Sequence, residues 1–118
     1  MTKTRAERLI GCEVRRLEEA HAQSSVAYGA FRDNELIAEA THLTDDLALQ
    51  ILVRRIYEIH SLEAIKQHGW RCARCRRVRR LQIHHRKYRS HGGSHRVENL
   101  EPVCWDCHKL IHKTERSR

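Results

Sequence analysis

The sequence lacks the features of a membrane-spanning or secreted chain. No apolar run approaches the roughly 18 residues that a helix needs to cross a bilayer. The chain opens without the basic, apolar and small-residue segments of a secretory leader. Four of its five cysteines have the spacing of a metal site, so a secreted disulfide framework is not expected. We therefore expect no membrane partner and a reducing, intracellular location, the cytoplasm.

Internal repeats are absent, and proline occurs once, at Pro102. The chain has 118 residues, which suffice for one domain, or for a small metal-stapled module with helices. They do not suffice for two ordinary hydrophobic cores. We therefore expect one compact unit.

Acidic side chains are scarce in the second half of the chain. Residues 1–65 hold 8 basic and 11 acidic side chains, a net charge of −3, whereas residues 66–118 hold 15 and 4, a net charge of +11. Positive charge concentrated in this way attracts a polyanion, and the nucleic-acid backbone is the commonest one. We expect residues 66–118 to bind nucleic acid; the alternative is that the charge serves solubility alone.

Residues 1–65 carry helical patterns. Apolar side chains recur at three- and four-residue steps over residues 4–21, which predicts an amphipathic helix, and a short helix is expected over residues 33–40. Thr44, followed by two aspartates, is typical of a helix start. The helix that it opens is expected over residues 45–60, before a short helix over residues 61–69.

The predicted helix over residues 45–60 is apolar around most of its circumference. Such a helix must be covered by the first helix, by the cysteine-rich module or by a second copy of the chain. A homodimer through the N-terminal helices is therefore one expectation. Partner or substrate selection by residues 1–65 is another.

Two cysteine pairs have the spacing of a zinc site. Cys72/Cys75 and Cys104/Cys107 each enclose two residues, a turn that lets both sulfurs reach one tetrahedral ion. The 28 residues between the pairs exceed the usual zinc-ribbon spacer of about 15–20, so a further element is inserted there. We predict one structural Zn²⁺ whose binding energy folds a unit with too small a core.

The inserted segment predicts a hairpin and a helix. Apolar and polar residues alternate over residues 78–85, which is typical of a strand. Residues 86–96 are expected to form a basic loop that contains Gly92-Gly93. Residues 97–103 are expected to be extended, and residues 105–113 have helical spacing. Together with the helices of residues 1–65, this pattern predicts an α+β chain.

Four motifs of this segment resemble the HNH endonuclease signature in order and spacing. They are Ile83-His84-His85, Gly92-Gly93, Glu98-Asn99-Leu100 and Cys104-Trp105-Asp106-Cys107-His108. The resemblance covers residues 69–112. It implies that residues 66–118 form a ββα-metal (HNH) nuclease module, clamped by the four-cysteine zinc site. The α-helical region that the patterns of residues 1–65 predict precedes this module and lies outside the resemblance.

The resemblance also implies catalytic roles. His85 matches the general base, which suits an imidazole with a pKa near neutrality, and Asn99 matches the residue that fixes the loop and orients the base. His84 and His108 match the ligands of the catalytic ion. His112, four residues after His108, matches a further ligand of colicin-like members; a helix C-terminus also favours histidine without any metal.

Imidazole ligands favour a transition ion over magnesium, so Mn²⁺, Ni²⁺ or Zn²⁺ is expected ahead of Mg²⁺ as the catalytic divalent ion. Arg86, Lys87, Arg89 and Arg96 are expected to contact phosphates, although each could belong to a generic basic face. The expected function is single-metal hydrolysis of phosphodiester bonds, with double-stranded DNA as substrate. The alternative is a zinc-stabilised DNA-binding module without catalysis.

Overall fold

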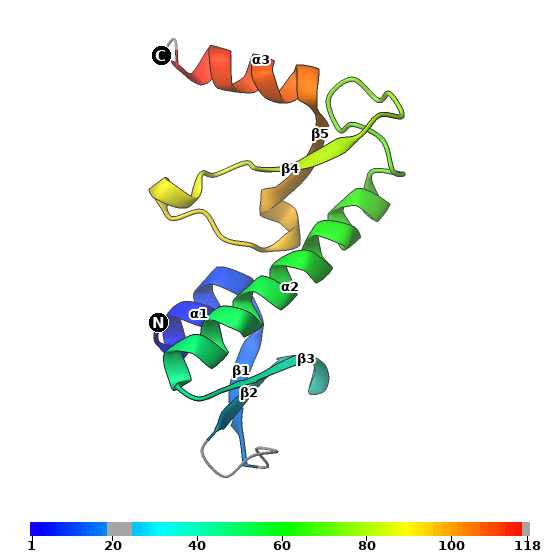
Figure 1. Cartoon of the computed structure of the whole chain (residues 1–118). Helices are drawn as coiled ribbons and strands as arrows, with labels where there is room; N and C mark the ends of the chain where they lie inside the picture. Colours follow the sequence, from blue (N-terminus) through cyan, green and yellow to red (C-terminus); the bar gives the residue numbers. More distant parts are fainter. Residues whose placement is uncertain (19–24, 117–118) are drawn as a thin grey trace. The chain divides into compact units, whose positions relative to one another are not determined.

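The chain forms two compact units. A computed structural model describes residues 1–18 and 25–116. Unit 1 comprises Met1–Ile59 with Ser94–Arg96, and unit 2 comprises His60–Gly93 with Val97–Arg118 (Figure 1). The expectation of one compact unit is therefore wrong, because the second unit is built around its cysteines and needs little apolar core. The predicted mixture of helix and sheet is confirmed.

Unit 1 is a three-stranded antiparallel sheet with helices, not the predicted all-helical region. The strands pair in the order β1-β2-β3. Its elements are α1 (Lys3–Ile10), β1 (Glu13–Leu17), β2 (Val26–Arg32), β3 (Glu35–His42) and the N-terminal part of α2 (Asp45–Gln67).

The first helix ends much earlier than its apolar spacing predicted. Gly11 adopts φ 68° and its N–H donates to the Glu7 carbonyl at 2.9 Å, which closes α1. The chain then turns into β1, whose Val14 is fully buried. The predicted helix over residues 4–21 is thus wrong beyond Ile10, and its last residues, 19–21, lie outside the described part of the chain.

The predicted helix over residues 33–40 is also wrong, because this segment is a turn followed by β3. Asp33 and Asn34 both have positive φ, 53° and 65°. A two-residue turn with positive φ at both positions matches the twist of an antiparallel hairpin, and Asp and Asn tolerate this conformation. Pairing with β2 therefore overrides the helical propensity of the Glu- and Ala-containing segment.

The predicted start of α2 is confirmed. The Thr44 hydroxyl oxygen accepts from the Leu47 N–H at 3.2 Å, and the Thr44 carbonyl accepts from the Ala48 N–H at 3.0 Å. The predicted break before Ser61 is wrong, since α2 continues to Gln67. One serine costs a helix only a few tenths of a kcal/mol, so it does not end a helix that is otherwise well formed.

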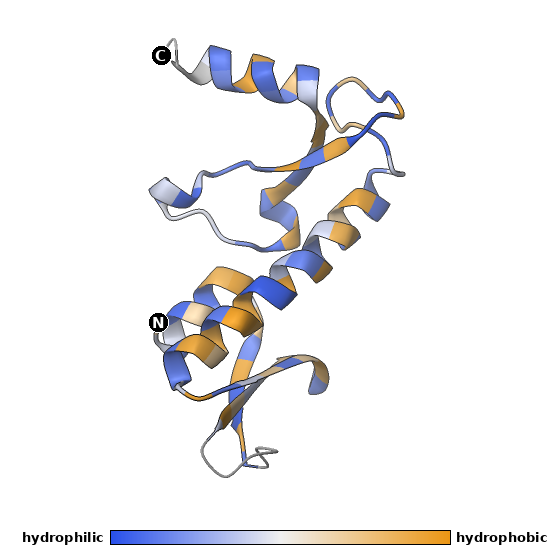
Figure 2. Cartoon of the chain, in the orientation of Figure 1, coloured by the Kyte–Doolittle hydropathy of each residue, from blue (hydrophilic) through white to orange (hydrophobic). Residues whose placement is uncertain are grey.

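The apolar face of α2 is covered within unit 1. Ala48, Leu49, Leu52, Val53 and Ile56 are buried in one core with residues of α1 and the sheet. Figure 2 shows the hydrophobic stretches of α2 in orange. The residues from α1 and the strands in this core are Ala6, Ile10, Cys12, Val14, Tyr28, Ala30 and Ala40. This part of α2 is therefore covered by α1 and the sheet of the same chain.

Unit 2 contains an antiparallel strand pair followed by a helix that contacts both strands. The pair runs in register from Leu81 opposite Cys104 to His85 opposite Leu100. The predicted strand starts three residues later than expected, and the predicted extended segment begins with a 3₁₀ turn. The elements are β4 (Leu81–His85), the 3₁₀ turns η1 (Arg89–His91) and η2 (Val97–Asn99), β5 (Leu100–Cys104) and α3 (Trp105–Arg116).

Unit 2 has a small core centred on cysteine. Cys72, Val103 and Cys104 are buried, and Leu81, Cys107 and Ile111 pack on them. Among the described residues, no helix combines the length and the hydropathy that a bilayer span requires.

Candidate functional site

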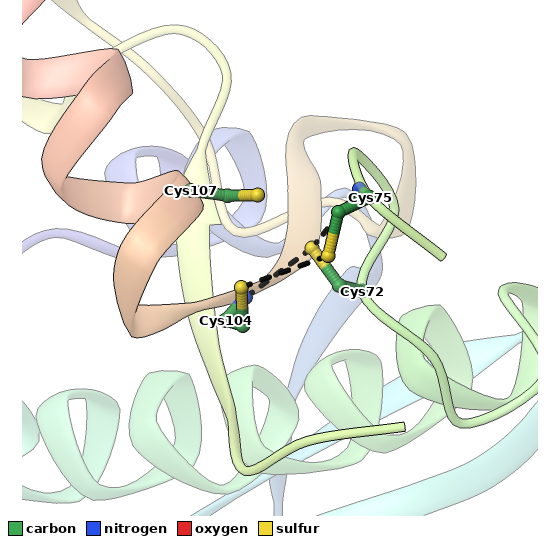
Figure 3. A group of neighbouring side chains, drawn as sticks. All are labelled: Cys72, Cys75, Cys104 and Cys107. Atoms are coloured by element: carbon green, nitrogen blue, oxygen red, sulfur yellow. Dashed lines mark hydrogen bonds between the residues drawn. The ribbon is translucent and has the colours of Figure 1, made fainter. Parts of the chain in front are cut away.

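The four cysteines of unit 2 converge at one point (Figure 3). Cys72 and Cys75 lie in the turn before β4, Cys104 ends β5, and Cys107 lies in the first turn of α3. Their sulfurs all lie within 4.8 Å of one another, and the Sγ atoms of Cys75 and Cys104 are 3.8 Å apart. Tetrahedral zinc with Zn–S bonds of about 2.3 Å separates its sulfurs by about 3.8 Å. The cluster therefore suggests a structural zinc site.

Backbone donors surround the Cys72 sulfur. The N–H groups of Cys75 and Cys104 donate to it at 3.5 and 3.4 Å. Burial opposes ionisation of this thiol, but the backbone donors and a neighbouring thiol outweigh burial and lower the pKa of Cys72 to about 6. Burial and the other three thiols raise the pKa of Cys107 to about 12. Four thiolates at this distance repel one another unless a cation joins them, which fits a resident Zn²⁺.

Three histidines form a second cluster in unit 2. His84 of β4 and His108 and His112 of α3 bring ring nitrogens within 4.8 Å of one another. The Nε2 atoms of His108 and His112 are 2.9 Å apart, and their rings are nearly perpendicular at 88°. The four-residue step places both rings on one face of α3, opposite the buried His84.

The donor chemistry of the three-histidine cluster fits a divalent transition ion. Burial, and to a lesser extent the neighbouring His112, lowers the pKa of His108, which keeps this imidazole neutral at pH 7. Neutral imidazole is the form that binds metal. The structure thus brings together the three residues that the sequence predicted as ligands of the catalytic ion.

His85 lies next to this cluster but is not part of it. Alternation along β4 directs its side chain away from that of His84. A general base must keep its lone pair for a proton, so separation from the ligand group suits that role. Burial, then the electrostatic influence of Arg89 and of His84, lower the pKa of His85. The imidazole is therefore in its neutral, proton-accepting form at pH 7.

Asn99 fixes the loop that follows His85. Its side-chain oxygen accepts from the Lys87 N–H at 2.8 Å, and its side-chain amide donates to the Lys87 carbonyl at 3.1 Å. The Arg86 N–H donates to the Asn99 carbonyl at 2.8 Å. Asn99 therefore holds the backbone of the two residues after His85 through hydrogen bonds.

Gly93 packs against the same backbone from within the loop. A Cβ at this position would lie 1.8 Å from the Lys87 carbonyl oxygen, so no other residue fits without movement. The Gly93 N–H donates to the Tyr88 carbonyl at 2.8 Å. Gly93 is thus a packing requirement of the loop after His85, whereas Gly92 has open space around it and adopts a positive φ of 80°.

Tyr88 joins the three-histidine cluster, and little in the sequence indicated this contact. Its ring is nearly parallel to that of His112, with centroids 5.9 Å apart, and edge-on to that of His84. Its hydroxyl is buried and has no hydrogen-bond partner within the described part of the chain. The one available signal was an aromatic residue in a loop that is otherwise basic.

Glu101 is the second residue that sequence reasoning missed. It lies directly opposite His84 in the strand pair and forms ion pairs with Arg74 and Arg86. Only the register of the hairpin brings a carboxylate to this place. Counting residues outward from the predicted turn along both strands could have identified Glu101 as the residue opposite His84. Residues that are opposite each other in a strand pair have their side chains on the same face.

The four predicted phosphate-binding residues have different surroundings. Arg86 pairs with Glu101, and Arg89 lies close enough to His85 to affect its pKa. The Lys87 side chain is exposed while its backbone is held by Asn99. Arg96 belongs to unit 1, where its side chain lies over Gly11.

Comparison with protein families identifies residues 72–114 as a match to the HNH endonuclease family. The matched segment contains both clusters. No match to the chain is found among the curated proteins or among the solved structures. The family match suggests a nuclease or nucleic-acid-binding function for unit 2.

Proposed function

We propose that the chain is a metal-dependent endonuclease that hydrolyses phosphodiester bonds of double-stranded DNA through a ββα-metal module in unit 2. The observation that carries this proposal is the second cluster. A module that only binds DNA needs the cysteine site and positive charge, but it has no use for three convergent imidazoles beside a neutral histidine. The charge of +11 on residues 66–118 supports a polyanionic substrate.

Each residue of the site has a defined task in this proposal. His84, His108 and His112 would hold the divalent ion, which when bound polarises a phosphoryl oxygen and offsets charge on the departing 3′ oxygen. His85 takes the proton of the attacking water, so that hydroxide character develops only beside the phosphorus. Because the 3′ oxygen departs from the phosphorus, cleavage leaves 5′-phosphate ends.

The remaining residues position this base and balance charge. Asn99 holds the backbone after His85, so the imidazole approaches the water from a fixed direction. Arg89 supplies a positive charge beside His85, where negative charge grows on the phosphate. The four cysteines would hold a zinc ion that acts as a clamp, because they come from the turn before β4, the end of β5 and the start of α3.

Plasmid nicking tests the proposal. Supercoiled DNA is incubated with the wild-type chain and Mg²⁺, Mn²⁺, Ni²⁺ or EDTA, and with the His85→Ala variant. We expect nicking with a divalent ion, strongest with a transition ion, and a loss of about 10²–10⁴-fold in His85→Ala, the usual contribution of a general base. His91→Ala is the matched control, because His91 lies in the loop that follows His85 but belongs to neither cluster.

Two outcomes would contradict the proposal. Undiminished cleavage by His85→Ala would remove this residue from the mechanism. DNA binding without cleavage in any of the metals would favour the non-catalytic binding module. Zinc content and circular dichroism of each variant show whether the fold is retained.

A further inference from the structure

Glu101 is a buried carboxylate shared by two arginines. Its side chain is 5% exposed, and a buried carboxylate is costly unless it is paired. Arg74 donates to Glu101 through Nε and, at 3.5 Å, through Nη2, while Arg86 Nε lies 3.1 Å from Oε2. Each guanidinium has five N–H donors, so most of them remain available after pairing with the carboxylate.

Both arginines are fixed at their backbones. Arg74 lies between the two cysteines of the first pair, so the cysteine site sets its position. Arg86 follows His85, and its N–H is held by the Asn99 carbonyl. Their side chains are about half exposed, 53% for Arg74 and 51% for Arg86. The carboxylate thus orients two guanidiniums whose other edges face solvent.

These side chains line one pocket together with a residue of the three-histidine cluster. His84 and Glu101 are directly opposite in the strand pair, so their side chains share a face. The two guanidiniums and one carboxylate give the pocket a net positive charge. It is lined by His68, Ala73, Arg74, His84, Arg86 and Glu101.

We propose that Arg74 and Arg86, oriented by Glu101, form a phosphate subsite of the nucleic-acid site, beside the three-histidine cluster. A guanidinium edge matches two phosphate oxygens and binds them with charge-assisted hydrogen bonds. The pocket binds the backbone phosphate next to the scissile phosphate. This contact sets which phosphate of the DNA strand lies beside His84. The inference rests on the proposed function in taking a phosphodiester chain as the ligand.

A purely structural role is the competing explanation. The Arg74–Glu101–Arg86 group could do no more than tie the cysteine turn to the hairpin. In that case loss of one arginine would reduce thermal stability, but it would affect DNA binding no more than loss of any other surface arginine.

The first test measures binding without cleavage. Anisotropy of a labelled 20-base-pair duplex is titrated with the zinc-loaded chain, without added catalytic metal, at several salt concentrations. Arg74→Gln and Arg86→Gln should each weaken binding by about 10-fold or more, the loss expected for a charged hydrogen bond, and should lower the salt slope by about one. Arg80→Gln, which removes an exposed charge outside the pocket, should weaken binding by less than about 3-fold.

Equal losses of duplex affinity in Arg74→Gln, Arg86→Gln and Arg80→Gln would contradict the proposed phosphate subsite. Arg86→Gln leaves the cysteine turn unchanged, so it keeps the test decisive if Arg74→Gln fails to bind zinc. If the wild type never cleaves but the two pocket variants still bind more weakly than the control, the proposed nuclease fails while the subsite stands.

The second test separates positioning from charge. Glu101→Gln removes a negative charge beside the phosphate but releases both guanidiniums. We expect its duplex affinity to stay within about 3-fold of the wild type or to rise, while the kcat of cleavage falls about 10-fold, because a mispositioned strand reacts slowly. An unchanged kcat would show that Glu101 does not position the arginines for the reaction.

Discussion

At the scale of single residues, the backbone of Lys87 is held from two sides. Asn99 bonds both its N–H and its carbonyl, and Gly93 lies against the same carbonyl. His85 is two residues away, so the geometry of the proposed base depends on contacts that involve no catalytic atom. The motif positions Asn99 and Gly93 are explained by this packing.

Gly93→Ala should therefore impair cleavage and also lower stability, because the methyl group would meet backbone atoms rather than a flexible side chain. The new methyl group would push the loop away from Lys87, and a displacement of about 1 Å near a reacting group can cost about 10²-fold in rate. Nicking rates and melting temperatures of the two chains measure the effect. In Gly92→Ala, the matched control, the methyl meets open space and only the strain of φ 80° is added, about 1 kcal/mol.

Tyr28 contributes stability that depends on pH. Its hydroxyl donates to Asp45 Oδ1 at 2.9 Å. Burial first, then the bond to Asp45 and its charge, raise the pKa of Tyr28 above its ordinary value of about 10. Above pH 10 the unfolded chain loses this proton before the folded chain does, so the stability present below pH 10 falls as pH rises.

Tyr28→Phe should lower the free energy of unfolding at pH 7 by about 1.5–3 kcal/mol, the range for a hydrogen bond to a charged group. The difference from the wild type should shrink above pH 10. Urea denaturation at pH 7, 9 and 10.5 measures it. A difference that is constant over this range would show that Tyr28 ionises alike in the folded and unfolded chains.

At the scale of elements, the long helix α2 shows which predictions survive folding. Its start at Thr44 depends on a cap that is local in sequence, and this prediction is confirmed. The helices expected over residues 4–21 and 33–40 depended on periodicity alone. A glycine cap ended the first, and pairing with β2 converted the second into a strand.

Removal of the cap hydroxyl should destabilise unit 1. Thr44→Ala leaves the Leu47 N–H without its acceptor, and a cost of about 1 kcal/mol is expected. Urea denaturation of the zinc-loaded chain measures the change. Thr44→Ser keeps the hydroxyl and should stay within a few tenths of a kcal/mol of the wild type; equal losses in both variants would exclude the cap as the cause.

At the scale of the whole molecule, the two units draw stability from different sources. Unit 1 has a core of aliphatic residues from α1, α2 and the sheet. In the described part of unit 2, the core cluster has three buried residues, two of which are cysteines. A unit with so small a core is expected to depend for folding on the zinc that its four cysteines suggest.

Zinc removal should therefore unfold unit 2 and spare unit 1. After treatment with a strong chelator, the amide NMR signals of β4, β5 and α3 should collapse to random-coil positions, whereas those of β1 to β3 should stay dispersed. His112→Ala, which removes an imidazole but no thiolate, should keep both sets dispersed before chelation. Collapse of the whole spectrum would show that the two units fold as one.

The sequence by itself determined the features that depend on local spacing: the two cysteine pairs, the histidine motifs, the start of α2 and the uneven charge. Such features follow from a few consecutive residues, because a turn or a helical step sets the distance between them. Only the tertiary structure decided the sheet of unit 1, the contact of Tyr88 with the histidines and the placement of Glu101 beside His84. These depend on strand register and on packing between distant segments, where long-range contacts override local propensity.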